Sequence, residues 1–416
     1  MRGAFWSLAG AIIARGLALA VAIPVGRHLG REALGSYGVL QATVAMFGLP
    51  ASFAAGLATT KYIAEFRQDD PDRARRVMTL ALILGVLAGS LSTAALALTG
   101  PWLASGTLGD AALGPLLQGG SILVILNGIS LAQSSSLAGL EAFRQIARTS
   151  AILGTISAPI LLSGTLLFGL RGAVGALVIS QALTVVINQM VLRKVSREAG
   201  ISTSLAGWTV ELHTVARFSL PLVATGLLSA PITWACSAML VNSEDGYSEM
   251  GLVNAGAPFF AIVVFLGASL SHGIFPGLAD AFARTDRVSI QRMVRALMLV
   301  TVSVSVPLAI AGAIASPWLI GLYGPQFRNG WAVVAITFAT GAVYCFHLVF
   351  SQLLLAAGAV GRWFWLHLGW SGAQVALTYL MLRWGAVGFT SARLGSFLLA
   401  AGLGARLVLP RVYRKD

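Results

Sequence analysis

The sequence has little charge and almost no cysteine. Only 10% of its 416 residues are charged, while 57% are hydrophobic; a soluble domain carries about 25% charged residues. A chain this poor in charge lacks the polar surface that water requires, so we expect an integral membrane protein. The two cysteines, Cys236 and Cys345, lie far apart within apolar stretches. They suit neither a disulfide framework nor a metal site.

Motifs of soluble enzymes are also missing. The chain contains no H-E-x-x-H, G-x-S-x-G or P-loop pattern. The glycine-rich run Gly26–Gly38 follows an apolar helix rather than a strand, which argues against a dinucleotide site. The loops expected on the outer side are short and leave little room for a catalytic domain. We therefore expect no catalytic residues, no cofactor and no enzymatic activity.

Long apolar runs are what the sequence has in abundance, and they predict an all-α membrane protein. A bilayer crossing needs about 20 apolar residues, and these runs are too continuously apolar for barrel strands. The only breaks within two closely spaced pairs are Arg171 and Arg383-Trp384. The twelve predicted spans cover residues 4–26, 37–63, 77–99, 114–139, 149–168, 172–191, 218–240, 251–275, 296–315, 331–356, 363–382 and 386–409.

Basic residues predict the orientation. The formal net charge is +13, but the basic residues form short clusters between apolar spans, unlike the stripes that bind nucleic acid. If both termini are cytoplasmic, inside segments hold 19 of the 28 Lys and Arg residues and outside segments hold five. This bias follows the positive-inside rule. We expect a multi-pass protein of a cell membrane with both termini in the cytoplasm.

An internal repeat divides the chain into two halves. The segment beginning at Ile63 matches the one beginning at Leu278, and Pro101-Trp102 recurs as Pro317-Trp318. Six spans in each half give both halves the same orientation, with the substrate site expected between them. The predicted domains are a six-helix lobe (1–195), a cytoplasmic linker (196–216), a second six-helix lobe (217–410) and a cytoplasmic tail (411–416).

The charged residues inside the predicted spans are basic. All fifteen Asp and Glu residues lie in loops or at span ends. Arg15 lies near the middle of the first span on a face of small residues, so we expect it to point into the bundle, as an anion ligand or as a partner for backbone carbonyls. Arg393 shares a face with Thr390, Ser396, Ala400 and Gly404. Lys61 is a candidate ligand or a snorkelling side chain, and Arg406 fits an interfacial anchor.

Neutral polar residues give weaker signals. The repeat aligns Gln41 with Asn254, and the two could bind substrate or join helices. His272, His347 and His367 could carry protons, with His272 our candidate coupling residue. For each histidine, a packing role competes with this reading.

Three segments resemble one family of transporters. "GRHLGREALGSYGVLQA", "ATTKYIAEF" and "LAGLEAFRQIA", in this order and with the six-plus-six repeat, resemble bacterial polysaccharide transporters of the Wzx-type O-antigen flippases. These belong to the superfamily that also includes multidrug exporters of the MATE class. Twelve predicted spans, rather than fourteen, make the lipid II flippase of that superfamily a poorer match.

The resemblance implies a substrate and a site. The substrate would be an anionic oligosaccharide on undecaprenyl pyrophosphate, moved across the bacterial inner membrane by alternating access. Two lobes would form a V around a cationic central cavity, where Arg27 and Arg31 with Arg15 and Lys61 would surround the pyrophosphate. Polymerases and glycosyltransferases of the same pathway would be partners, along with membrane lipids.

Other function classes fit less well. A MATE-like antiporter of organic cations is the main alternative, but it calls for a mid-membrane carboxylate that this sequence lacks. A membrane-embedded glycosyltransferase would need catalytic carboxylates in a sizeable outer loop. A membrane scaffold would give Arg15 no purpose beyond packing.

Overall fold

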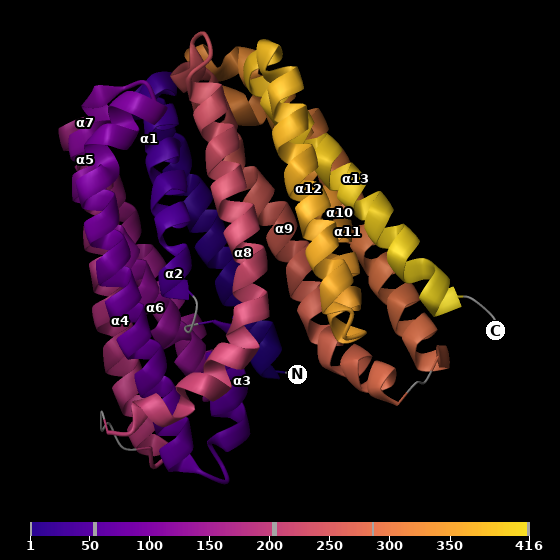
Figure 1. Ribbon diagram of the computed structural model, residues 1–416. Coiled ribbons are helices and arrows are strands. Elements are labelled where there is room, and N and C mark those ends of the chain that lie inside the picture. Colours follow the sequence, from indigo (N-terminus) through magenta and orange to yellow (C-terminus); the bar gives the residue numbers. More distant parts are fainter. Residues whose placement is uncertain (1, 53–55, 202–205, 285–286, 414–416) are drawn as a thin grey trace. The chain divides into compact units, whose positions relative to one another are not determined.

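The computed structural model describes residues 2–52, 56–201, 206–284 and 287–413. Side chains of several helix segments, among them residues 2–15, 217–228 and 266–280, lie outside the description. The described residues form helices and no strand (Figure 1). The α-helices are α1 (Arg2–Phe47), α2 (Leu49–Ser52), α3 (Leu57–Phe66), α4 (Pro71–Trp102), α5 (Gly114–Gly120), α6 (Ile122–Gly139), α7 (Phe143–Glu198), α8 (Leu212–Val241), α9 (Gly246–Ala283), α10 (Arg287–Gly321), α11 (Trp331–Ala356), α12 (Val360–Met381) and α13 (Gly385–Tyr413). Short π or 3-10 turns are η1 (Leu103–Thr107), η2 (Ala111–Leu113), η3 (Trp208–Glu211), η4 (Pro325–Gly330) and η5 (Leu382–Trp384).

The all-α membrane class is confirmed. Seven helical segments of the described residues are long and apolar enough to cross a bilayer. One of them, Phe143–Glu198, has 56 residues, or about 84 Å at 1.5 Å per residue, more than twice the hydrocarbon thickness. The protein is therefore a multi-pass membrane protein, while the count of twelve spans stays a prediction.

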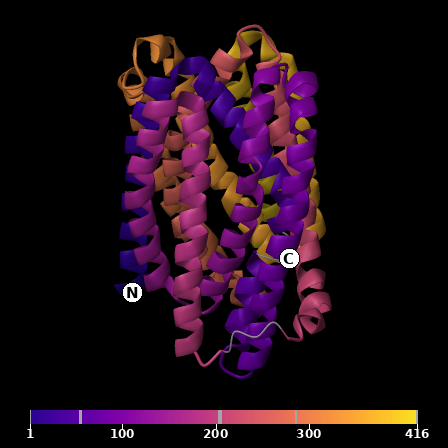
Figure 2. The ribbon, with the colours of Figure 1, turned by 90° about the vertical axis from the view of Figure 1, so that its left-hand side faces the viewer.

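Glycines in the gaps between predicted spans mark the divisions of the long helices. In α7 the break lies at Gly169, whose φ is 58°, within the predicted gap 169–171 and two residues before Arg171. Between α12 and α13 the 3-10 turn η5 contains Arg383-Trp384, as expected, and Gly385 follows it with φ 56°. Only glycine adopts a positive φ at little cost, so the turn settles at the nearest glycine. Around Gly169 the backbones of Gly164 and Gly172 abut, and Figure 2 shows the two limbs of α7 side by side.

The chain forms two compact units. Unit 1 comprises residues 1–29 and 36–234, and unit 2 comprises residues 30–35 and 235–416. This division falls inside α8, and a six-residue strip of the first half belongs to unit 2. The predicted lobe boundaries themselves stay a prediction.

Unit 1 is built on α4, which packs against α3 and α6, while α6 also packs against α7. The start of α4 follows from the sequence, because Asp70 caps the helix by accepting from the N–H of Arg73 at 2.9 Å and Pro71 occupies the first turn. Small residues bring α4 and α6 together, as is usual where helices associate in lipid. Ile63, Leu80 and Leu137 are fully buried in the core of this unit.

Unit 2 is centred on α11, which packs against α9, α10 and α13. Figure 1 shows α10 to α13 as neighbouring long helices of this unit. Gly312 of α10 faces the ring of Phe338, and Gly341 brings α11 against Val263 of α9. This close packing forms a buried layer between the helices, in which polar side chains need hydrogen-bond partners.

Candidate functional site

The residues of unit 1 that were predicted to bind substrate do not form a cluster in the part of the chain that the structure describes. Arg15 lies in α1, and its side chain is outside the described residues. Arg27 and Gln41 are exposed side chains of α1. Lys61 is exposed on α3, with its ammonium 5.0 Å from the ring centre of Tyr62. A role in substrate binding for these four residues stays a prediction.

Arg31 belongs to unit 2, where it forms an ion pair. Its guanidinium donates to Oε1 of Glu249 at 2.9 Å and to the backbone oxygen of Ser248 at 3.4 Å. The other carboxylate oxygen of Glu249 accepts from the N–H of Ala386 at 2.7 Å. Glu249, at the start of α9, therefore joins the helical segment just after the Gly30 kink of α1 to the N-terminus of α13, where a negative charge is favoured. Arg31 thus has a carboxylate partner, which reduces the charge that it can offer to a ligand.

Sequence reasoning missed Glu249. All fifteen Asp and Glu residues were placed in loops or at span ends, and the loop of residues 242–249 that carries Glu249 was given no role. The available signal was that the predicted topology puts Arg31 and this loop on the same side of the membrane. Their pairing spans 218 positions, and no short-range pattern reports a contact of that separation.

Asn254 joins backbone segments rather than pointing to an open site. Its Nδ2 lies 3.1 Å from the backbone oxygen of Leu34 and 3.5 Å from that of Gly35. These bonds fasten α9 to the same segment of α1 that carries Arg31. Of the two roles expected for this residue, helix joining is the one that the contacts support.

Arg393 lies within a predicted span, and the structure describes the side chains around it. It lies on α13 with its guanidinium carbon 4.3 Å from the ring centre of Phe260 on α9. Thr390, Ser396 and Ala400, which share its helix face, are buried. Among the described residues no salt bridge involves Arg393. Its charge is therefore stabilised by ring faces rather than by a carboxylate.

Aromatic rings extend from Arg393 into the core of unit 2. Phe260 packs 5.6 Å from Tyr344, and Tyr344 meets Phe397 edge-on at 4.9 Å. Phe397 in turn stacks on Trp370 at 5.2 Å. The rings come from α9, α11, α12 and α13, so four helices position one aromatic layer beside a single guanidinium.

Two histidines meet in this layer. The rings of His347 on α11 and His367 on α12 lie 5.3 Å apart. His367 Nδ1 lies 3.0 Å from the backbone oxygen of Trp363, while the buried Nδ1 of His347 has no hydrogen-bond partner in the described part of the chain. Considered one at a time, the two histidines give no sign that they pair. Both are ten positions from Ala357, and this symmetry about the turn would have predicted their pairing in an antiparallel helix pair.

The predicted coupling residue His272 lies in α9, and its side chain is outside the described residues. A proton-carrying role for it stays a prediction. No group of three or more His, Cys, Asp or Glu side chains that could hold a metal occurs among the described residues. Chemically, the layer around Arg393 can hold an anion through the guanidinium fork and can pack apolar or ring-shaped groups against its aromatic faces.

Comparison with known sequences identifies relatives in polysaccharide export. The protein family described as "polysaccharide biosynthesis protein" matches residues 1–282. The EPS I polysaccharide export inner membrane protein EpsE of Ralstonia nicotianae is 25% identical over 388 residues, covering 91% of this chain and 86% of that protein.

Solved structures share the fold. An inward-facing multidrug resistance MATE family transporter of the MOP superfamily superposes with a TM-score of 0.79 at 14% identity, covering 96% of this chain and 94% of the other. A MOP superfamily transporter from Pyrococcus furiosus, described as having a binding pocket of reverse polarity, gives a TM-score of 0.69 at 14% identity, covering 99% and 95%. With the family matching well over half of its length, the chain belongs to the polysaccharide biosynthesis protein family.

Proposed function

We propose that this protein flips an undecaprenyl-pyrophosphate-linked oligosaccharide, a repeat unit of O-antigen or another surface polysaccharide, across the inner membrane by alternating access. The observation that carries the proposal is the chemistry of the intramembrane charge. Arg393 is set against aromatic rings with no salt bridge among the described residues, and no Asp or Glu lies mid-span in the sequence. Such a membrane interior favours an anion over a cation.

The relatives support the same substrate class. EpsE is named as a polysaccharide export inner membrane protein, and the solved neighbours are named as transporters. On this proposal, the protein lies in the bacterial inner membrane with both termini cytoplasmic, and it works beside the polymerase and glycosyltransferases of its pathway. Arg15, Arg27 and Lys61 would contribute positive charge in the first half of the chain.

A MATE-like exporter of organic cations is the competing function, favoured by the fold likeness alone. It would need an acidic group to hold the cation within the membrane. The predicted spans carry Asp and Glu only at their ends. The two functions therefore differ in the sign of the charge that the site must stabilise.

The test is leaflet translocation of a labelled polyprenyl-pyrophosphate oligosaccharide in liposomes, with wild type compared to Arg15→Ala and Arg15→Lys. We expect transport by the wild type, loss in the alanine variant and partial retention in the lysine variant, with all three proteins folded. If the wild type instead exports organic cations and moves none of these lipids, the flippase proposal is wrong and the cation-exporter function takes its place.

A further inference from the structure

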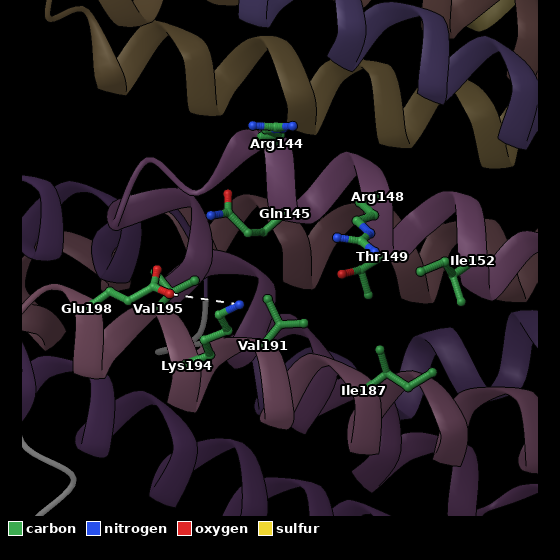
Figure 3. A pocket seen from close by; sticks show the side chains of 10 residues that line it. All are labelled: Arg144, Gln145, Arg148, Thr149, Ile152, Ile187, Val191, Lys194, Val195 and Glu198. Atoms are coloured by element: carbon green, nitrogen blue, oxygen red, sulfur yellow. Dashed lines mark ion pairs between the residues drawn. The ribbon is translucent and has the colours of Figure 1, made fainter.

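The basic end of α7 carries a pocket that the proposed function does not use. Because α7 folds back at Gly169, its two ends, near Phe143 and Glu198, meet at the same level. The pocket between the limbs has a volume of about 650 Å³. In Figure 3, side chains 144–152 of the first limb and 187–198 of the second line it together.

The polar part of this pocket is cationic. Arg144 and Arg148 come from the first limb and Lys194 from the second. Glu198 is the only acidic lining residue, and its carboxylate is 3.9 Å from the Lys194 ammonium, with both side chains more than half exposed. An ion pair this exposed to solvent contributes little stability, so the Lys194 ammonium stays available to a ligand. The lining therefore keeps a net charge of +2.

Much of the remaining lining is apolar. Ile152, Ile187, Val191 and Val195 form this apolar part, and the neutral polar side chains of Gln145 and Thr149 complete the wall. Val186 and Met190, one position from lining residues, are 49% and 65% exposed on a membrane helix. Cations at the helix ends with aliphatic side chains beside them match an amphiphile that has an anionic head and acyl chains.

We propose that this pocket binds the headgroup of an anionic phospholipid of the surrounding bilayer, with the phosphate between Arg144, Arg148 and Lys194 and the upper acyl carbons against Ile152 and Ile187. Basic pockets between membrane helices on the cytoplasmic side bind such headgroups, and the positive-inside rule places this end there. The volume suits one headgroup with its first methylene groups. The proposal requires that α7 lies in a membrane with this end on the cytoplasmic side, and it does not rest on the proposed function.

The chain offers a matched control. Arg193 and Arg197 are exposed at the same end of α7 but do not line the pocket. Arg144→Gln/Arg148→Gln and Arg193→Gln/Arg197→Gln therefore remove the same charge from the same helix end. Arg144→Lys/Arg148→Lys keeps the charge and loses the guanidinium fork.

The measurement is lipid retention by the purified full-length protein, by native mass spectrometry after reconstitution in equal phosphatidylglycerol and phosphatidylcholine. We expect the wild type and the Arg193/Arg197 variant to retain phosphatidylglycerol selectively. Retention should be about 10- to 30-fold weaker in the glutamine variant of Arg144 and Arg148, since each basic residue near a lipid surface contributes about one order of magnitude or less. The lysine variant should fall between them.

Three outcomes would overturn the proposal. Equal losses in the two glutamine variants would assign the effect to general surface charge. No lipid preference in the wild type would remove the site. Displacement of phosphatidylglycerol by equimolar polyprenyl diphosphate, and not by inorganic phosphate, would assign the pocket to a substrate-type lipid. Circular dichroism of each variant checks that the helices are intact.

Discussion

Arg31 and Glu249 form an ion pair at 2.9 Å, although 218 positions separate them. The same carboxylate caps the start of α13 through the N–H of Ala386. We expect Glu249→Ala to lower the stability of unit 2 more than Arg31→Ala, because only the former also removes the cap, which contributes about 1 kcal/mol. Both side chains are about one-quarter exposed, so the coupling itself should be about 0.5–1 kcal/mol. A double-mutant cycle on thermal unfolding in detergent measures it, and zero coupling would contradict the pairing.

Arg393 should matter for transport more than for folding. We expect Arg393→Ala to abolish translocation of a pyrophosphate-linked oligosaccharide and Arg393→Lys to reduce it, because a lysine offers no planar fork to a phosphate. Arg406→Gln on the same helix is the control, since Arg406 is exposed and fits an interfacial anchor. Liposome assays give the rates. Wild-type rates in Arg393→Ala would remove this residue from the site.

His347 should act as a packing residue. Its ring lies 5.6 Å from Phe397 and 6.1 Å from Tyr344. Its buried Nδ1 has no described hydrogen-bond partner, and its Nε2 lies 3.5 Å from Oγ of Ser351, so replacing the ring by phenylalanine removes only this one long contact. We expect His347→Phe to fold and to transport within about twofold of wild type across pH 6–8. A transport rate that collapses, while His367→Phe also fails, would instead favour a proton-carrying pair.

Glu211 should hold the segment after α7 against α4. Its buried carboxylate lies 3.0 Å from Nε of Arg73 and 3.5 Å from Nε of Arg76. We expect Glu211→Ala to destabilise unit 1 by about 1–3 kcal/mol, because two guanidinium groups lose a buried acceptor. Faster tryptic cleavage near Arg193 and Arg197 would report the loosening. Asp69→Ala, an exposed acidic residue before α4, serves as the control and should leave cleavage unchanged.

The hairpin of α7 should depend on Gly172. A Cβ at this position would meet the carbonyl of Gly164, so we expect Gly172→Val to cost roughly 3 kcal/mol and to lower the yield of folded protein. Gly175→Ala lies three positions further along the same limb, where a Cβ meets nothing within 4 Å. Size-exclusion profiles of the two variants in detergent should differ clearly. Identical profiles would argue against the close approach of the limbs.

The all-α membrane class could be predicted from the sequence, because the length of an apolar run is a local property. The turns of the two close pairs fall in the predicted gaps 169–171 and 383–385, although the residues that adopt positive φ there are Gly169 and Gly385 rather than the charged residues named as breaks. Helical periodicity also placed Arg393 on one face with Thr390, Ser396 and Ala400, and these three residues are buried.

The contacts of the site could not be predicted in the same way. Asn254 was expected to bind substrate or to join helices, and only the fold shows that its amide reaches the backbone of Leu34. The pairs Arg31–Glu249 and Arg393–Phe260 each join distant parts of the chain. Such contacts depend on how whole helices pack, and periodicity in a single segment carries no information about its neighbour.

The short strip of residues 30–35 has a consequence for the connectivity of the protein. The chain leaves unit 1 at Leu29, returns at Ser36 and leaves again after Trp234, so three backbone links join the units instead of one. A protein divided into two polypeptides between residues 201 and 206 would not separate into two self-sufficient halves. The second fragment would lack the arginine that pairs with Glu249, and the first would carry it without a partner. Co-expression should therefore restore a complete unit 2, as in a fragment complementation pair.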